Sequence, residues 1–125
     1  MNAEIKILIV DDFASIRKII KGHLRQIGFL NTVEAEDGIA ALNIIKSGAI
    51  DLIISDWNMP NMSGLELLKA VRADENFGKI PFLMVTVESS PKNIREAIKA
   101  GVNNYIAKPF SPATLNEKIS QMMGK

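Results

Sequence analysis

The chain has 125 residues, 15 Lys and Arg against 14 Asp and Glu, 47% hydrophobic residues and no cysteine. This length suits one domain, large enough to fold without a disulfide or a metal. The lack of cysteine excludes disulfide scaffolds, cysteine nucleophiles and iron–sulfur clusters, and the balanced charge argues against nucleic-acid binding. The apolar stretch at residues 7–10 is too short for a signal peptide or a membrane span, so a cytoplasmic protein is expected.

Short, β-branched apolar segments recur along the chain, and several are apolar throughout rather than alternating. They are residues 5–10, 32–35, 52–54, 82–85 and 105–107. Strands of this kind are buried on both faces, as in a parallel sheet.

Segments with helical periodicity follow each predicted strand. Their apolar stripes are Ile16, Ile19, Ile20, Leu24 and Ile27; Ala41, Leu42, Ile44 and Ile45; Leu65, Leu68 and Val71; Ile94, Ala97 and Ile98; and Leu115, Ile119, Met122 and Met123. Gly28, Gly48 and Gly101 follow three of them, which is a helix C-cap signal. Helix starts are indicated by Asp37, by Ser63 with Glu66, and by the Ser-Pro pairs at 90–91 and 111–112.

The order is therefore β-α, five times over. Right-handed crossovers fold such a chain into a single α/β domain, a doubly wound (βα)5 sandwich with a five-stranded parallel sheet and helices on both faces. The expected strand order is the flavodoxin-like order 2-1-3-4-5. Ligands of such sheets bind beyond the carboxyl ends of the strands, where functional residues are therefore expected.

Charged and polar residues stand at four of these ends: Asp11 and Asp12, Asp56, Thr86, and Lys108. Three crowded carboxylates repel one another and need a compensating cation, which Mg²⁺ supplies with oxygen ligands. Lys108 adds a positive charge and Thr86 a hydroxyl donor, a set that suits a phosphoryl group. One aspartate could itself accept that group covalently.

Each residue alone has a simpler explanation. Asp11-Asp12 could cap the next helix, Asp56 could be a turn residue, Thr86 a strand-end hydroxyl and Lys108 a solvated surface lysine. Their joint occurrence at four strand ends favours a site.

Other phosphate-binding classes lack their motifs here. The P-loop G-x-x-x-x-G-K-[ST] and the dinucleotide-binding G-x-G-x-x-G are absent. The residues after the first strand, Asp11 to Ser15, are neither an FMN phosphate loop nor the Asp-x-Asp of haloacid-dehalogenase-type phosphatases.

Four segments carry a resemblance to a known family: residues 10–12, 55–66, 84–86 and 105–110. They resemble bacterial two-component response-regulator receiver domains, and most closely the stand-alone chemotaxis regulators of the CheY type. The resemblance covers the whole chain. It implies one receiver domain over residues 1–125 with no output domain.

The resemblance also implies a role for each site residue. Asp56 is expected to be the phosphoacceptor, and Mg²⁺ is expected to be held by Asp12, Asp56, the backbone carbonyl of Asn58 and, through water, Asp11. Thr86 and Lys108 would bind the phosphoryl oxygens, Thr86 and Tyr105 would form the switch, and the Lys108–Pro109 peptide would be cis.

The implied partners are proteins. A histidine kinase donates the phosphoryl group, the flagellar motor switch receives the signal, and a phosphatase can be a further partner. The chain would be a monomeric signalling protein rather than an enzyme, with slow self-dephosphorylation and no nucleic-acid or membrane partner. The expected partner surface comprises Ser89, Ser90, Ile94, Ile98, Tyr105, Ala107 and Lys118.

Two positions depart from the family pattern. Val87 stands where a smaller residue is common, and its bulk could narrow access to Asp56. Ser89-Ser90-Pro91 stands where motor-binding relatives carry adjacent lysines. A different protein target, or a role as a phosphate sink, therefore remains an alternative to the flagellar motor.

Overall fold

The computed structural model describes residues 5–87 and 90–123, in which strands and helices alternate along the chain. The elements are β1 (Ile7–Val10), α1 (Ala14–Gln26), β2 (Thr32–Ala35), α2 (Gly38–Lys46), β3 (Leu52–Asp56), α3 (Gly64–Arg72), β4 (Phe82–Thr86), α4 (Pro91–Lys99), β5 (Asn104–Ala107) and α5 (Pro112–Met123).

The strands form one parallel sheet in the order β2-β1-β3-β4-β5. The predicted fold class and strand order are therefore confirmed. The central strands β1, β3 and β4 are buried along their whole length, which explains why they are apolar throughout.

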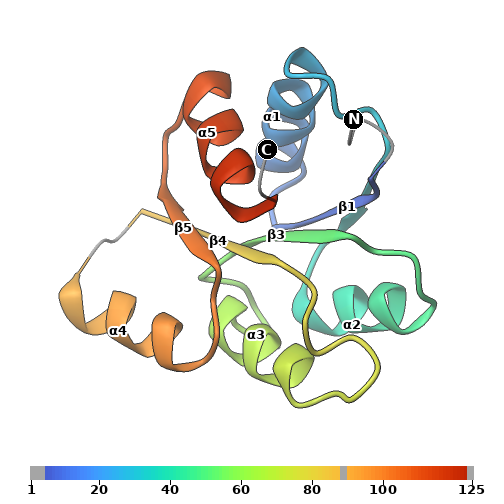
Figure 1. The fold of residues 1–125 in the computed structure, drawn as a ribbon, viewed down its shortest axis with the longest axis vertical. Helices are drawn as coiled ribbons and strands as arrows, with labels where there is room; N and C mark the ends of the chain where they lie inside the picture. The colour runs from blue at the N-terminus through green and yellow to red at the C-terminus, as the bar shows by residue number, and fades with distance from the viewer. Residues whose placement is uncertain (1–4, 88–89, 124–125) are drawn as a thin grey trace.

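Helices cover both faces of the sheet. Figure 1 shows α1 and α5 on one face and α2, α3 and α4 on the other. Alternate residues of β1 enter separate cores: Leu8 and Val10 pack on the α2–α3 side, and Ile7 and Ile9 on the α1–α5 side. Among the described residues, no helix has the length and apolar character needed to cross a membrane.

Most local signals in the sequence correspond to real element ends. Gly28, Gly48 and Gly101 have φ values of 101°, 92° and 96°, the left-handed conformation of helix C-termini. Asp37 caps α2 through the amide of Ala40, and Ser63 with Glu66 forms the predicted capping box on α3. The hydroxyls of Ser90 and Ser111 accept hydrogen bonds from Asn93 and Thr114 at the starts of α4 and α5.

Three details differ from the prediction. The first strand begins at Ile7 rather than at residue 5. The capping alternative for Asp11-Asp12 is wrong, because the N-cap of α1 is Phe13, with no side-chain cap. The stripe on α4 is only partly a core face, since Ala97 is buried but Ile98 is 60% exposed. In Figure 1, α4 lies at the edge of its layer and has little sheet surface to cover.

Candidate functional site

Three aspartates meet at the carboxyl edge of the sheet. Asp11 and Asp12 follow β1, and Asp56 is the last residue of the adjacent β3. One carboxylate oxygen from each lies within 4.8 Å of the others. Asp11 is fully buried, Asp56 is 6% exposed and Asp12 is half-buried, so the cluster is a recessed acidic corner.

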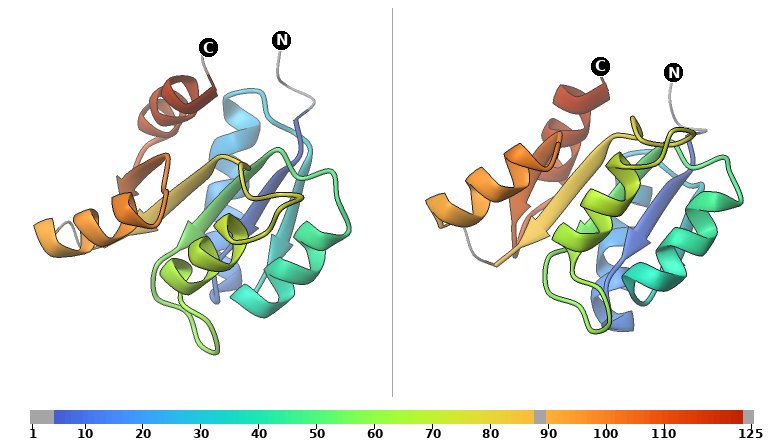
Figure 2. Two further views of the ribbon diagram at one scale, coloured as in Figure 1. Left: turned by 60° about the horizontal axis from the view of Figure 1, so that its bottom comes forward. Right: turned by 90° about the horizontal axis from the view of Figure 1, so that it is seen from below.

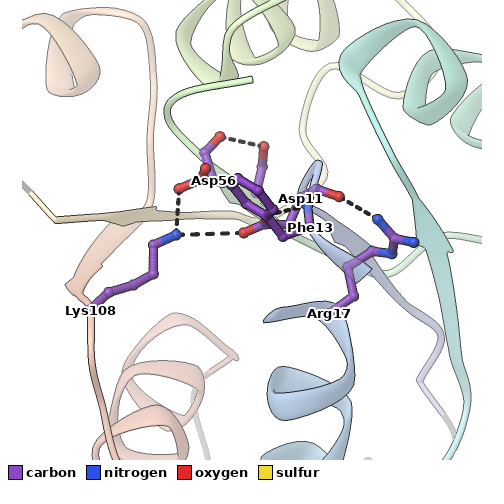
Figure 3. A network of polar contacts seen from close by, with 6 residues as sticks. Asp11, Phe13, Arg17, Asp56 and Lys108 are labelled. Atoms are coloured by element: carbon purple, nitrogen blue, oxygen red, sulfur yellow. Dashed lines mark hydrogen bonds and ion pairs between the residues drawn. The ribbon is translucent and has the colours of Figure 1, made fainter. Parts of the chain in front are cut away.

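Lys108 reaches this corner from the loop after β5. Its ammonium lies 3.0 Å from Oδ1 of Asp56 and 3.6 Å from Oδ2 of Asp11 (Figure 3). Its backbone amide donates to the carbonyl of Thr86 over 2.8 Å, and the Lys108–Pro109 peptide is cis, as expected. Lys108 thus forms ion pairs with two of the three carboxylates.

The charge at Asp56 is incompletely compensated. Burial raises the pKa of the Asp56 carboxyl above its ordinary value. The hydrogen bond and the positive charge of Lys108 oppose this rise, while the nearby charge of Asp11 adds to it. Further positive charge would therefore be accommodated beside Asp56.

Backbone and side-chain contacts fix the loop that carries Asp11. Its Oδ1 accepts a hydrogen bond from the amide of Phe13 (3.0 Å). From the opposite side, Nη1 of Arg17 donates to the Asp11 carbonyl (2.6 Å; Figure 3). Nε of Arg17 also pairs with Oε1 of Glu34 on β2 (2.9 Å). Arg17 is not among the predicted site residues, because a basic residue on an otherwise basic helix gives no sign of such a contact.

The donor set fits a hard divalent cation. Oδ2 of Asp11 and Oδ1 of Asp12 are buried and make no hydrogen bond within residues 5–87 and 90–123. Buried polar atoms are normally paired, so these oxygens are available as ligands. Carboxylate oxygens in a partly open corner match the coordination of Mg²⁺, which retains several waters.

Thr86 and Tyr105 lie on neighbouring strands beside the corner. Thr86 ends β4, is buried and is in register with Ala107 of β5, while Tyr105 is in register with Met84. Tyr105 is half-buried, and the ammonium of Lys118 lies 5.3 Å from its ring centroid. Asn58 is exposed in the loop after β3, two residues beyond Asp56.

The expected partner surface falls on α4, β5 and α5. β5 is one of the two edge strands, with α4 on one face of the sheet and α5 on the other (Figure 1). Ile98 and Ala107 are exposed there, whereas Ser90, Ile94, Tyr105 and Lys118 are half-buried. Ser89 lies outside the described residues.

Comparison with known proteins gives the family. Residues 7–120 match the response regulator receiver domain. The chain belongs to this family. It is 52% identical to chemotaxis protein CheY-3 of Vibrio cholerae over 98% of this chain and 94% of that protein. It is 54% identical to chemotaxis protein CheY of Pseudomonas aeruginosa over 94% of each chain. It is thus a receiver domain of the CheY type.

Solved receiver domains have the same architecture. V. cholerae CheY4 superposes with a TM-score of 0.87 at 38% identity, over 94% of this chain and 97% of that one. The receiver domain of a P. aeruginosa sensor histidine kinase superposes with a TM-score of 0.86 at 28% identity, over 96% and 98%. That relative is described with a magnesium ion coordinated in its active site cleft.

Proposed function

We propose that this receiver domain is a response regulator that acts as a monomer in the cytoplasm. A chemotaxis histidine kinase phosphorylates Asp56, and the phosphorylated protein binds the flagellar motor switch. The observation that carries this proposal is the recessed Asp56 carboxylate, held 3.0 Å from the Lys108 ammonium and next to two further carboxylates.

The chemistry of this corner suits phosphoryl transfer. A carboxylate oxygen of Asp56 attacks the phosphorus of the donor's phosphohistidine, a P–O bond forms, and the P–N bond to the imidazole breaks. Lys108 lies where it can neutralise a phosphoryl oxygen. Asp11, Asp12, Asp56 and the carbonyl of Asn58 would hold Mg²⁺, which supplies positive charge to the transferred group.

The same charges supply a switch. An aspartyl phosphate adds roughly two negative charges, by analogy with other phosphorylated residues. The Thr86 hydroxyl and Lys108 are drawn toward it from two adjacent strand ends. Because β4 and β5 are hydrogen-bonded in register, a shift of Thr86 is transmitted to Tyr105 and the α4–β5–α5 surface.

The test has two arms. An autophosphorylated chemotaxis histidine kinase should transfer label to the protein in Mg²⁺. A peptide from a flagellar motor switch protein should then bind the protein more tightly in the presence of a small-molecule phosphodonor. Label transfer without a gain in peptide affinity would reject the motor as target.

A second candidate shares the same chemistry. Ser89-Ser90-Pro91 replaces the adjacent lysines of motor-binding relatives, and the Ser90 side chain is committed to capping α4. This difference favours another protein target or a phosphate sink. Either role predicts label transfer from the kinase with no binding of the motor-switch peptide.

A further inference from the structure

The loop between β3 and α3, residues 57–63, contains a strained turn. Asn61 has a φ of 69°, and the amide of Met62 donates to the carbonyl of Pro60 over 2.7 Å. A hydrogen bond between residues two apart around a positive φ is the pattern of a γ-turn, which is rare and strained. Such a conformation persists only where surrounding contacts hold it.

The start of α2 supplies these contacts. Nδ2 of Asn61 donates to Oδ2 of Asp37 over 3.1 Å, while Oδ1 of Asp37 accepts the amide of Ala40 over 2.8 Å. Both bonds lower the pKa of the Asp37 carboxyl, so the acceptor is a carboxylate at neutral pH. We call this hydrogen-bonded pair the Asp37–Asn61 clasp.

Close packing reinforces the clasp. Gly38 is buried, and a methyl group in place of its hydrogen would lie 2.7 Å from Sδ of Met62. Only glycine allows the first turn of α2 to approach the Met62 side chain this closely. The clasp and this contact therefore hold consecutive residues of the loop against α2.

The other end of the loop is fixed independently. The amide of Gly64 donates to the carbonyl of Trp57 over 2.8 Å, directly after Asp56. Asn58 lies in the loop between Trp57 and the clasp, and its carbonyl is the proposed backbone ligand of the metal. Figure 2 shows the loop extending beyond the carboxyl ends of the strands, so its tip needs the contact with α2 to stay in place.

We propose that the Asp37–Asn61 clasp sets the affinity of the site for Mg²⁺ by holding the loop that carries the Asn58 carbonyl. This inference rests on the proposed function, because it concerns the same metal site. Asp37 and Asn61 act as positioning residues, through the loop rather than on the metal.

The first experiment removes the clasp without changing charge. Asn61→Gly deletes the side-chain hydrogen bond and also relieves the positive φ. Loss of an outer-shell partner lowers metal affinity on the order of tenfold. Mg²⁺ affinity is measured by titration of Trp57 fluorescence and by calorimetry. Thermal unfolding without metal should stay near that of the wild type, and Asn76→Gly, in the remote loop before β4, is the matched control.

The second experiment rebuilds the clasp with its polarity reversed. In the double variant Asp37→Asn/Asn61→Asp, an amide at position 37 still caps α2 and donates to a carboxylate at position 61. Asn is as good an N-cap as Asp, and Asp tolerates the left-handed conformation. The net charge is that of the wild type, so Mg²⁺ affinity should return close to the wild-type value.

Equal Mg²⁺ affinity in wild type, Asn61→Gly and Asn76→Gly would overturn the proposal. So would a double variant as weak as Asn61→Gly. A wild-type protein that shows no response to Mg²⁺ by either method is a different result: it contradicts the proposed metal site itself, and the role of the clasp with it.

Discussion

Asp56 is buried beside a second carboxylate, and Lys108 and the backbone amide of Trp57 offset its charge in part. Its ionised form is therefore unfavourable in the folded protein without metal. We predict that Asp56→Asn raises the free energy of unfolding at neutral pH by roughly 0.5–2 kcal/mol, the usual range of a stabilising substitution. Thermal unfolding in a chelator measures this difference.

The pH dependence of that difference has a defined sign. Because the folded pKa of Asp56 lies above 3.8, the ordinary value of an aspartate, the unfolded chain loses this proton first as pH rises. Wild-type stability therefore falls, relative to the variant, between 3.8 and the folded pKa. The gain in stability from Asp56→Asn is therefore fully present above this pH range and absent below it. If Asp56→Asn is more stable than the wild type by the same amount at all pH values, the charge of Asp56 is not the cause of the difference.

Val87 directly follows Thr86, the last residue of β4. It is 66% exposed and lines, with Lys108 and Ile19, a pocket of about 240 Å³ between α1 and the loop after β5. Its branched side chain is stiff, and we expect it to restrict the approach of a phosphodonor to Asp56. We predict that Val87→Ala is phosphorylated several-fold faster by a small-molecule donor, and that its activated form binds the motor-switch peptide more tightly.

The stability cost of Val87→Ala should be within about 0.5 kcal/mol, as for other surface substitutions. Leu30→Ala is the matched control, because Leu30 is 68% exposed and lies before β2, outside the pocket. Rates and affinities for Val87→Ala equal to those of the wild type and Leu30→Ala would assign Val87 no part in access.

At the scale of the elements, Arg72 joins two loops at the amino-terminal edge of the sheet. It ends α3 and donates to the carbonyls of Gly78, Ile80 and Gly101 and to Oδ1 of Asn103, at 2.7–3.0 Å. Burial lowers the pKa of its guanidinium below the ordinary value of an arginine. We predict that Arg72→Met costs roughly 2–4 kcal/mol of stability, because the acceptors lose a charged donor.

Chemical denaturation measures that cost, with Arg95→Met on the exposed surface of α4 as control. Mg²⁺ affinity should be unchanged in Arg72→Met at temperatures where it is folded, because the loops lie at the edge of the sheet opposite the aspartates. If Arg72→Met is as stable as Arg95→Met, water replaces the hydrogen bonds of Arg72 at no cost in stability, which contradicts the prediction.

For the whole molecule, metal binding and folding are coupled. A ligand at 100 times its Kd that binds only the folded state adds about 2.7 kcal/mol of stability. We therefore predict that Mg²⁺ raises the Tm of the wild type and raises that of Asp12→Asn much less. Differential scanning calorimetry with and without a chelator measures both shifts. Equal shifts in Tm for the wild type and Asp12→Asn would mean that Mg²⁺ does not bind at Asp12.

The fold could be predicted from sequence because its signals are local. Each signal depends on a few neighbouring residues. Examples are the uninterrupted apolar strands, the glycines with positive φ such as Gly28, and the helix caps such as Ser63. The proximity of the aspartates and Lys108 could also be predicted, because the carboxyl ends of parallel strands lie at one edge of the sheet.

Features that depend on contacts between residues far apart in the sequence could not be predicted. The contact of Arg17 with the Asp11 carbonyl, the clasp between Asp37 and Asn61, and the exposure of Ile98 arise from how helices and loops meet. The capping pattern at Asp37 and the apolar stripe with Ile98 describe only their own helices, so neither pattern predicts how these residues meet the rest of the molecule.

The identity of the phosphoacceptor is tested most directly by mass spectrometry of the intact and digested protein. After incubation with a small-molecule phosphodonor and Mg²⁺, the wild type should gain one phosphoryl group, located on Asp56. A chelator should abolish the gain, Asp56→Asn should show none, and Asp51→Asn, just before β3, should behave as the wild type. A phosphoryl group on another residue, or equal labelling of Asp56→Asn, would contradict the assignment of Asp56.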